Sequence, residues 1–533
     1  MTCAYSVWRG GIVLSFRHRT LFLMGMLVIG LAALPSKADA APESEQAAPD
    51  LHKTAGDNLS PGRPTLNSAL KTTLYSPASH GLTALDYDAF LRHFGPDASG
   101  LPGDWGGDRS SIIEQAFGAT PAPPEHILRD QAAPIRRFLL SQGINVQLSY
   151  KNETMWNVAG GIERGGDYAH EVALQLDTDV AKLTRLPALS GWSTHMAMIQ
   201  RAGRSVTHDR VGERAVNLAE AYGTGGNVLV HLVYFYAEKQ FFNNRVNAAV
   251  GRMPVTLSFA SSPINCAFMS ICASPMAFKG TPGNSVWPNS TWGGRLRLRP
   301  ALDNFLAMGA YQVNANYGGI SGWSWFNRGS TGVFLPIEDT WQPYFGPHGL
   351  VGHYKVGYAY NSSTYPNLLG AIPEGERKYA PTARAGHRHT FWFMADQMLW
   401  RTGKTQTSGG ILFGGFIYNS ATTSIFHQQE YIGLLAPSLV PGRQKDRFGI
   451  VFSHYKFSPL LRRGEELRED AGLNPGANLR GPQSDESVME VFYGAAVMRG
   501  ILFQPEYEYV VHPGGSTHIR NASVIGFKVT ALL

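Results

Sequence analysis

The feature that most constrains this fold is an alternation of apolar and polar side chains that begins near Gly143. In 144–151 (INVQLSYK) every second side chain is apolar, and the same two-residue period returns in 172–179, 294–299 and 501–511. Successive side chains of a β-strand point to opposite faces, so this period is typical of strands with one apolar and one polar face. Since it recurs almost to the C-terminus, the pattern predicts an all-β fold.

Composition narrows the kind of β-protein. Charged residues make up 16% of the 533 residues, below the ~25% typical of soluble domains, while the chain holds 59 glycines and 11% aromatic residues. After residue 41 no apolar run reaches the length of a spanning helix. If the mature chain lies in a membrane it must therefore form a closed barrel, because only helices and barrels satisfy their backbone there.

The length of the expected strands and the placement of their aromatic side chains favour a membrane barrel over a soluble sandwich, whose strands are usually shorter. Aromatic residues sit near strand ends, as in Tyr507 with Tyr509 and Trp392 with Trp400, which is typical of the interfacial girdles of outer-membrane barrels. At ~25 residues per strand and connection we expect a transmembrane antiparallel β-barrel of about 16 strands. We expect long loops at 317–345, 361–387 and 462–480, and a closing strand at 523–533 with Lys528 and Thr530 facing inward.

The N-terminal region predicts export. Residues 17–19 are basic, 21–34 are apolar, and Ala38-Asp39-Ala40 forms an A-x-A cleavage site, so 1–40 reads as a cleavable signal peptide. An uncleaved anchor is the alternative. Residues 41–134 are rich in Ala, Pro and Ser and predict a periplasmic extension, with a short helix at 110–117. The third segment, 135–533, starts with a second short helix, at 135–141, and contains the barrel.

Two cysteines, Cys266 and Cys272, lie six residues apart in the irregular segment 251–275. A disulfide between them fits an oxidising compartment such as the periplasm or cell surface. Two unpaired thiols are the alternative. A zinc site is disfavoured, because one C-x5-C without a nearby histidine pair lacks the usual ligand spacing.

Several motifs, taken in order, resemble the carbohydrate-selective porins of the OprB type. They are GDWGG at 103–107, GR with a following Phe at 251–259, NCAF…C…P at 265–275, WGGRLRLRP at 292–300 and PEYEYVVHPGG at 505–515. The resemblance implies an outer-membrane barrel of about sixteen strands, monomeric or homotrimeric, that passes sugars such as glucose by facilitated diffusion. It also implies that the cysteine loop folds into or near the channel and narrows it.

A sugar-selective channel needs hydrogen-bond donors and acceptors that replace the hydration shell of the sugar. The inward row Arg295, Arg297 and Arg299 is the first candidate, since guanidinium groups offer a fixed fork of donors. Glu506 and Glu508 are the candidate acceptors, with 177 and 179 as weaker choices. The structural alternative is that these charges pair with one another to stiffen the wall.

Three more residues are candidates with open alternatives. Arg252 falls on the lipid-facing side of its strand by alternation, unless a bulge at Gly251 turns it inward. Trp323 and Trp325 share one face of a loop-like stretch and could form an apolar slide for sugar rings. Interface anchoring or loop packing is the alternative for this pair.

Other classes of function find less support. No G-x-S-x-G or H-E-x-x-H motif occurs, so we expect no enzyme, and we expect no cofactor and no metal. The net charge of +6 is not clustered, which disfavours nucleic acid as a partner. The expected partners are a carbohydrate and outer-membrane lipid or lipopolysaccharide. A general or anion-preferring porin, or a secreted sugar-binding β-protein, remains the alternative.

Overall fold

The computed structural model describes residues 127–532, except for 213–217, 220–225, 243–244, 273, 282, 302, 315–320, 324, 326–327, 347–349, 371–383, 403–408, 438–439, 444 and 476–479. The signal peptide expected at 1–40 and the helix expected at 110–117 lie outside these residues, as does most of the extension expected at 41–134. No helix within the described part combines the length and the apolar character that crossing a membrane requires.

The described strands form a single antiparallel wall that closes on itself. Each strand pairs with its neighbour in sequence, and the last strand, β17, pairs with the first, β1. One of the seventeen strands, β9, has two residues and lies beside β10, so sixteen strands form the closed wall, as predicted. Closure leaves no free edge among these sixteen described strands, and each of them finds two hydrogen-bonding neighbours.

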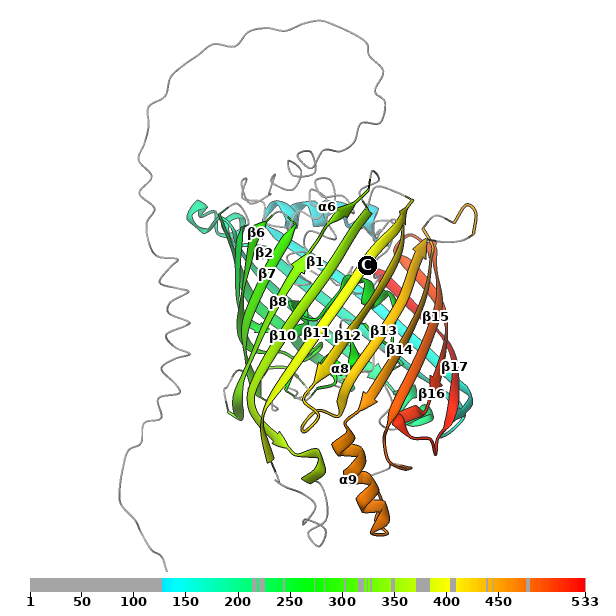
Figure 1. The fold of residues 1–533 in the computed structure, drawn as a ribbon. Helices are drawn as coiled ribbons and strands as arrows, with labels where there is room; N and C mark the ends of the chain where they lie inside the picture. Colours follow the sequence, from blue (N-terminus) through cyan, green and yellow to red (C-terminus); the bar gives the residue numbers. More distant parts are fainter. Residues whose placement is uncertain are drawn as a thin grey trace, which may run out of the picture. The chain divides into compact units, whose positions relative to one another are not determined.

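The strands are tilted and most exceed ten residues (Figure 1). They are β1 (Ile144–Gly161), β2 (Gly165–Asp179), β3 (Trp192–Gly203), β4 (Val228–Phe241), β5 (Val246–Met253), β6 (Thr291–Ala301), β7 (Asn304–Asn314), β8 (Ser330–Trp341), β9 (Tyr344–Phe345), β10 (Leu350–Pro366), β11 (Arg384–Arg401), β12 (Gly409–Asn419), β13 (Phe426–Pro437), β14 (Arg447–Phe457), β15 (Asp485–Met498), β16 (Ile501–Val511) and β17 (Arg520–Leu532).

Short helices occupy several connections. They are α6 (Arg129–Ser141), α7 (Val180–Thr184), α8 (Met276–Lys279) and α9 (Pro459–Asp470), with single turns η3 (Pro187–Leu189), η4 (Thr207–Val211), η5 (Val255–Leu257), η6 (Pro263–Ala267), η8 (Leu368–Gly370) and η10 (Pro513–Gly515). Helix α6 begins earlier than the predicted 135–141, because it passes through Pro134 despite the missing backbone donor.

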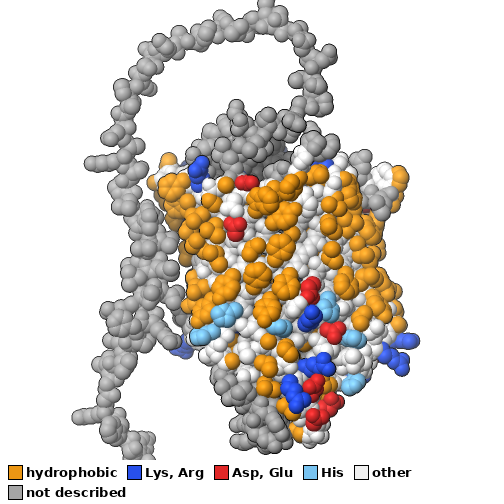
Figure 2. All heavy atoms as spheres, in the orientation of Figure 1, with side chains coloured by type: hydrophobic (Ala, Val, Ile, Leu, Met, Phe, Trp, Pro, Cys, Tyr) orange, Lys and Arg blue, Asp and Glu red, His pale blue; other side chains and the backbone are white. Residues whose placement is uncertain are grey.

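The predicted alternation holds along the strands that carried it. On β17, Lys528 and Thr530 are fully buried inside the wall while Ile525 is exposed on the outside. On β16, Glu506 and Glu508 point inward and Tyr507 outward. Figure 2 shows the result on one outer face, where apolar side chains form a broad band and charged groups gather below it.

One expectation about the facing of side chains in the wall is wrong. Trp392 is not in the outer girdle: it is fully buried, and its indole Nε1 donates to Glu338 at 2.7 Å. Trp400 is exposed, as expected, because a register shift between Met398 and Trp400 reverses the facing of the strand end. When alternation is counted across such a register shift, it assigns the side chains on one side of the shift to the wrong face of the strand.

The expected loops are also too long. The stretch 317–345 contains strands β8 and β9, and strands β10 and β11 extend into 361–387. The polar stretch 462–480 begins inside α9, where the Ser458 hydroxyl caps the helix by accepting from the backbone N–H groups of Leu460 and Leu461. These stretches are rich in Gly and polar residues, which hid the strand and helix periods.

The two ends of the barrel differ. At one end lie α6 and the chain's C-terminus, and the Ile127 N–H donates to the Leu532 carbonyl at 2.9 Å (Figure 1). Connections at this end are often very short, as between β6 and β7 or β15 and β16. At the other end lie α9 and the longest connections, including 254–290 between β5 and β6.

Candidate channel constriction

The connection between β5 and β6, residues 254–290, folds into the barrel and is hereafter the inserted loop. Most of its described side chains are buried, and α8 within it lies inside the outline of the wall (Figure 1). Three phenylalanines of the loop pack on aromatic rings of three different strands: Phe259 on Tyr311 (6.1 Å between centroids), Phe268 on Phe492 (5.0 Å) and Phe278 on Trp392 (5.3 Å). Since β7, β11 and β15 are spread around the wall, the loop crosses the lumen.

Polar side chains of the wall hold the inserted loop by its peptide groups. Three inward side chains accept from backbone N–H groups of the loop: Glu338 from Ala260 (2.9 Å), Glu490 from Met269 (2.7 Å) and Ser270 (2.9 Å), and Gln429 from Ala277 (2.8 Å). Three others donate to carbonyls of the loop: Lys355 to Ser261 (2.9 Å), Gln504 to Ala267 (3.1 Å) and Asn419 to Ala277 (2.9 Å). Hydrogen bonds to charged groups contribute about 1.5–3 kcal/mol each, so the loop is fixed on several sides.

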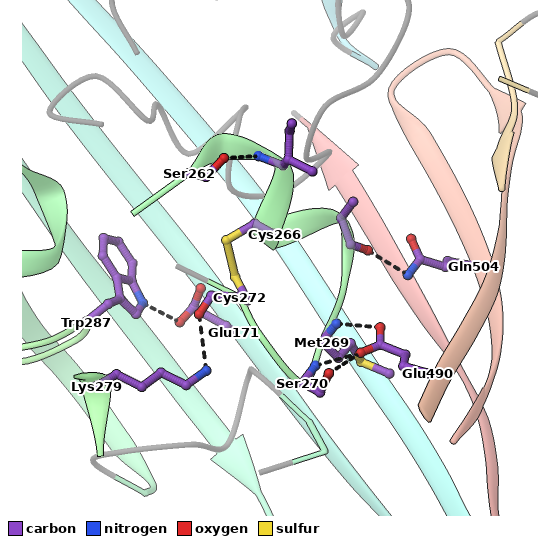
Figure 3. Close-up of a disulfide and its surroundings, with 12 residues drawn as sticks. Glu171, Ser262, Cys266, Met269, Ser270, Cys272, Lys279, Trp287, Glu490 and Gln504 are labelled. Carbon is purple, nitrogen blue, oxygen red and sulfur yellow. Dashed lines mark hydrogen bonds between the residues drawn. A yellow bond between two sulfur atoms is a disulfide. The ribbon is translucent and has the colours of Figure 1, made fainter. Parts of the chain in front are cut away.

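The two cysteines form the predicted disulfide within this loop. The Cys266–Cys272 Cα atoms lie 4.0 Å apart, and the bond closes the turn between η6 and the strand-facing residues Met269 and Ser270 (Figure 3). The carbonyl of Cys272 also accepts from Lys279 Nζ at 3.1 Å. The disulfide and this contact together fix the local path of the loop tip.

The arginine row faces the lumen from β6. Arg295 donates to Glu238 Oε2 on β4 at 2.9 Å and to Asn247 Oδ1 on β5. Arg297, two positions on, is 1% exposed, and the Arg299 guanidinium lies 4.9 Å from the centre of the Phe305 ring. The structure therefore brings all three arginines to one wall, with Arg295 charge-compensated inside it.

Glu506 and Glu508 lie on a different wall. They belong to β16, which the strand order places across the barrel from β6, and both are buried. Glu506 Oε2 accepts from Gln504 Nε2 at 3.2 Å, and both glutamates lie close to Glu490. The arginine and glutamate rows are thus opposed across the lumen.

The weaker carboxylate candidates, Asp177 and Asp179, have local partners. Asp177 Oδ1 is 2.8 Å from Nδ1 of His195 on β3, and Asp179 caps α7 by accepting from Lys182 N at 3.1 Å. Both side chains are buried. Their contacts stabilise the wall near its α6 end.

Arg252, Trp323 and Trp325 meet at the α9 end of the barrel. The pairing of β5 runs through Gly251 without a register shift, so the described ladder has no bulge there, and Arg252 lies opposite Phe235 and Trp292. Gly251 serves a close approach instead: a Cβ at this position would lie 2.5 Å from Tyr236 Cα.

Arg252 is fully buried because a segment of the β7–β8 connection covers it. Its guanidinium donates to the carbonyls of Gly322 and, at 3.1 Å, Ser290, and lies 5.7 Å from the Trp325 ring centre. Trp325 packs on the outward-facing Trp292 at 5.6 Å, and Trp323 and Trp325 are 44% and 37% exposed. This position on the outer side of the rim fits interface anchoring better than a slide within the lumen.

Sequence reasoning missed one ion pair beside the inserted loop. Arg201 of β3 contacts Glu171 Oε2 of β2 through Nε at 2.6 Å, and the loop residue Trp287 donates to the same oxygen at 3.2 Å (Figure 3 shows the Trp287–Glu171 contact). The alternation of side chains along each strand is enough to predict that both face inward, because Glu171 lies on the same face of β2 as Gln175, and Arg201 on the same face of β3 as His195.

A closed antiparallel wall with a loop inserted across its lumen defines a porin. The family model of the carbohydrate-selective porins, OprB family, matches residues 163–532. The chain belongs to this family, which confirms the resemblance seen in its motifs. It is a carbohydrate-selective outer-membrane porin and not an enzyme.

Individual relatives agree with this assignment. The chain is 25% identical to Porin B of Pseudomonas aeruginosa over 455 residues, covering 82% of this chain and 92% of that protein. It is 24% identical to the putative porin QuiX of Acinetobacter baylyi, covering 81% and 93%. The structure of Pseudomonas putida OprB at high pH superposes with a TM-score of 0.68 at 23% identity, covering 75% of this chain and 97% of that one, which supports the shared fold.

Proposed function

We propose that this chain forms a transmembrane channel through which glucose or related mono- and oligosaccharides diffuse without energy input. The observation that carries the proposal is the inserted loop, held across the lumen between a wall of arginines and a wall of glutamates. A fixed loop sets the size of the passage, and opposed donors and acceptors suit a neutral, hydroxyl-rich solute.

In this proposal the arginine row supplies hydrogen-bond donors. Arg295, Arg297 and Arg299 are all candidates, and the guanidinium of Arg295 also pairs with Glu238. Glu506 and Glu508 are the candidate acceptors on the opposite wall. A neutral sugar gains from both signs of charge, whereas a free ion is attracted to one wall and repelled by the other.

Arg252, Trp323 and Trp325 belong to the channel entrance in this proposal. Arg252 supports the covering segment through carbonyl contacts, and the exposed tryptophan faces are available either to a sugar ring or to the headgroup layer.

The same proposal includes export, orientation and organisation. Residues 1–40 act as a cleavable signal peptide, 41–134 form a periplasmic extension, and 135–533 contain the barrel. Outer-membrane barrels have short periplasmic turns and longer external loops, so the α6 end faces the periplasm and the α9 end the exterior. The protein works as a monomer or a homotrimer embedded in outer-membrane lipid.

Liposome swelling tests the proposal. Protein purified from outer membranes is reconstituted and exposed to isosmotic glucose, a disaccharide and a charged sugar acid of similar size. We expect glucose to enter much faster than into empty vesicles, and faster than the acid. Swelling no faster than that of empty vesicles would refute a channel for sugars.

An anion-preferring channel is the second candidate, favoured by the three lumen-facing arginines of β6. Single-channel recording separates the two. Current that glucose blocks in a concentration-dependent manner supports the sugar channel. Strong anion selectivity that glucose leaves unchanged supports the second candidate.

A further inference from the structure

Three inward carboxylates of β15 and β16 converge behind the tip of the inserted loop. Glu490 lies directly opposite Glu508 in the β15–β16 ladder, and Glu506 is the next inward residue of β16. One carboxylate oxygen of each lies within 4.8 Å of the others. Like charges directly opposite in a ladder destabilise a sheet, so this arrangement needs a compensating positive charge.

The compensation within the described chain is incomplete. Both oxygens of Glu490 are engaged by the loop, through Met269 N, Ser270 N and the Ser270 hydroxyl at 2.5 Å. Neither oxygen of Glu508 receives a hydrogen bond from the described residues, although this side chain is 0% exposed. An ionised carboxylate buried without donors is very costly, so Glu508 must either take up a proton or meet a further ligand.

One lysine approaches the cluster. The ammonium of Lys528 on β17 acts electrostatically on both Glu506 and Glu508, and it too is fully buried without a hydrogen-bond partner among the described residues. Glu153, opposite Lys528 in the β1–β17 ladder, adds another carboxylate near Glu508. Against three carboxylates a single ammonium leaves an excess of two negative charges, and Glu153 increases it.

We propose that Glu490, Glu506 and Glu508 bind one divalent cation, of the Ca²⁺ or Mg²⁺ type, that fastens the inserted loop to the β15–β16 wall. Hard divalent cations take carboxylate oxygens as ligands, and a charge of two matches the excess left by Lys528. Glu490 links the two halves of the device, because it contacts the loop backbone and the cluster together. The site departs from the expectation of no metal, since its ligands come from two strands with no short ligand motif.

A bound cation assigns Glu506 and Glu508 to the inserted loop, so in this inference they no longer act as the acceptors for sugar considered above. The cluster is closed to solvent, so the cation acts on the position of the loop and not on the solute. A cation buried in this way enters during folding and exchanges slowly afterwards. Removing it therefore requires unfolding in the presence of a chelator.

Metal content after controlled refolding tests the proposal. Full-length protein is unfolded in urea with EDTA, freed of chelator, and refolded in detergent with CaCl₂, with MgCl₂, or with neither. After desalting we expect about one Ca²⁺ or Mg²⁺ per chain, with half occupancy reached when the cation concentration during refolding lies in or below the range of about 10⁻⁴–10⁻³ M seen for extracellular calcium modules. Wild-type protein that retains no divalent cation overturns the proposal, even if no variant folds.

Two matched variants locate the site. Glu508→Gln keeps the shape of the side chain and should weaken cation binding at least tenfold. Glu430→Gln removes a carboxylate of the outer face, outside the cluster, and should leave the bound cation unchanged. Retention of full affinity by Glu508→Gln, or an equal loss in both variants, overturns the assignment. If Glu508→Gln does not fold, Glu508→Asp is the substitute, with the same expected loss of affinity.

Discussion

Arg295 on β6 and Glu238 on β4 form a buried ion pair, with Nη2 and Oε2 2.9 Å apart, that spans the intervening strand β5. Asn247 of β5 completes the bridge by accepting from the same guanidinium. The charge of Arg295 is thus compensated within its own wall, whereas Arg297 and Arg299 extend the row from there. Arg295 therefore supports the wall through this pair.

Arg295→Ala should destabilise the barrel strongly. Removing one partner of a buried ion pair leaves the other charge uncompensated, at a cost of about 3–5 kcal/mol. Urea unfolding in detergent, followed by loss of the heat-modifiable folded band, measures the change. Arg295→Ala with Glu238→Gln should recover part of it; a double variant no more stable than the single one would contradict this role.

Arg297→Ala should change selectivity. Loss of one positively charged side chain from the lumen shifts the permeability ratio toward cations. It also weakens the block by glucose, because the sugar loses a fork of hydrogen-bond donors. Single-channel recording with and without glucose measures both. Arg297→Lys keeps the charge but not the fork, so it should restore ion selectivity more fully than sugar block. Unaltered block and selectivity in Arg297→Ala would exclude this residue from the site.

Glu338→Gln should loosen the inserted loop. The carboxylate accepts from Ala260 N at 2.9 Å and from Trp392 Nε1 at 2.7 Å, and neutral hydrogen bonds are roughly half as strong as charged ones. We expect about 1–3 kcal/mol less stability and a noisier open-channel current. Glu430→Gln is the control: its 3.7 Å pair with Lys456 is half-exposed on the outer face, so its effect should stay below about 1 kcal/mol.

Reduction of the Cys266–Cys272 disulfide should change the conductance of the channel without lowering the stability of the barrel wall. The loop keeps its hydrogen bonds to the wall without the disulfide, and the wall itself is held by strand pairing. We therefore expect altered conductance with dithiothreitol at an unchanged unfolding midpoint. The Cys266→Ser, Cys272→Ser double variant should reproduce this and no longer respond to reductant. A fall in the midpoint comparable to that of Arg295→Ala would contradict the separation.

Acid should loosen the segment around η4 in the β3–β4 connection. Burial raises the pKa of Asp209, but hydrogen bonds from His208 and Arg204 and their charges outweigh it, so the pKa lies below its usual value. A depressed carboxylate pKa contributes stability at neutral pH that is lost as pH falls through the folded value. Asp209→Asn should imitate acid at pH 8 by speeding tryptic cleavage after Arg204 or Arg210. Wild-type protein should become equally susceptible to pepsin only below about pH 4; cleavage independent of pH would contradict the link.

The barrel was predictable because one period determines it. The alternation in 501–511 and the inward Lys528 and Thr530 both match the structure, since lipid on one side and polar groups on the other select a single facing for each strand. The prediction failed at Trp392, because nothing in the letters around Met398 reveals a bulge that reverses parity.

The site was less predictable because its contacts are long-range. The arginine row and the disulfide follow from local pattern, but the bonds from Glu490 to Met269 join residues more than two hundred positions apart. Arg252 shows the same limit. The alternation along β5 correctly places its side chain on the outer face, but only the fold reveals the segment at Gly322 that buries it.

The wall grips the inserted loop through peptide N–H and carbonyl groups, which every residue except proline carries alike. The wall therefore binds the backbone of the inserted loop, and these hydrogen bonds depend little on which side chains the loop carries. Replacements at loop positions that neither pack on the wall nor donate to it can reshape the aperture while the barrel keeps its grip. Such a scaffold lends itself to acquiring new solutes, in evolution or by design, through changes confined to one short stretch of chain.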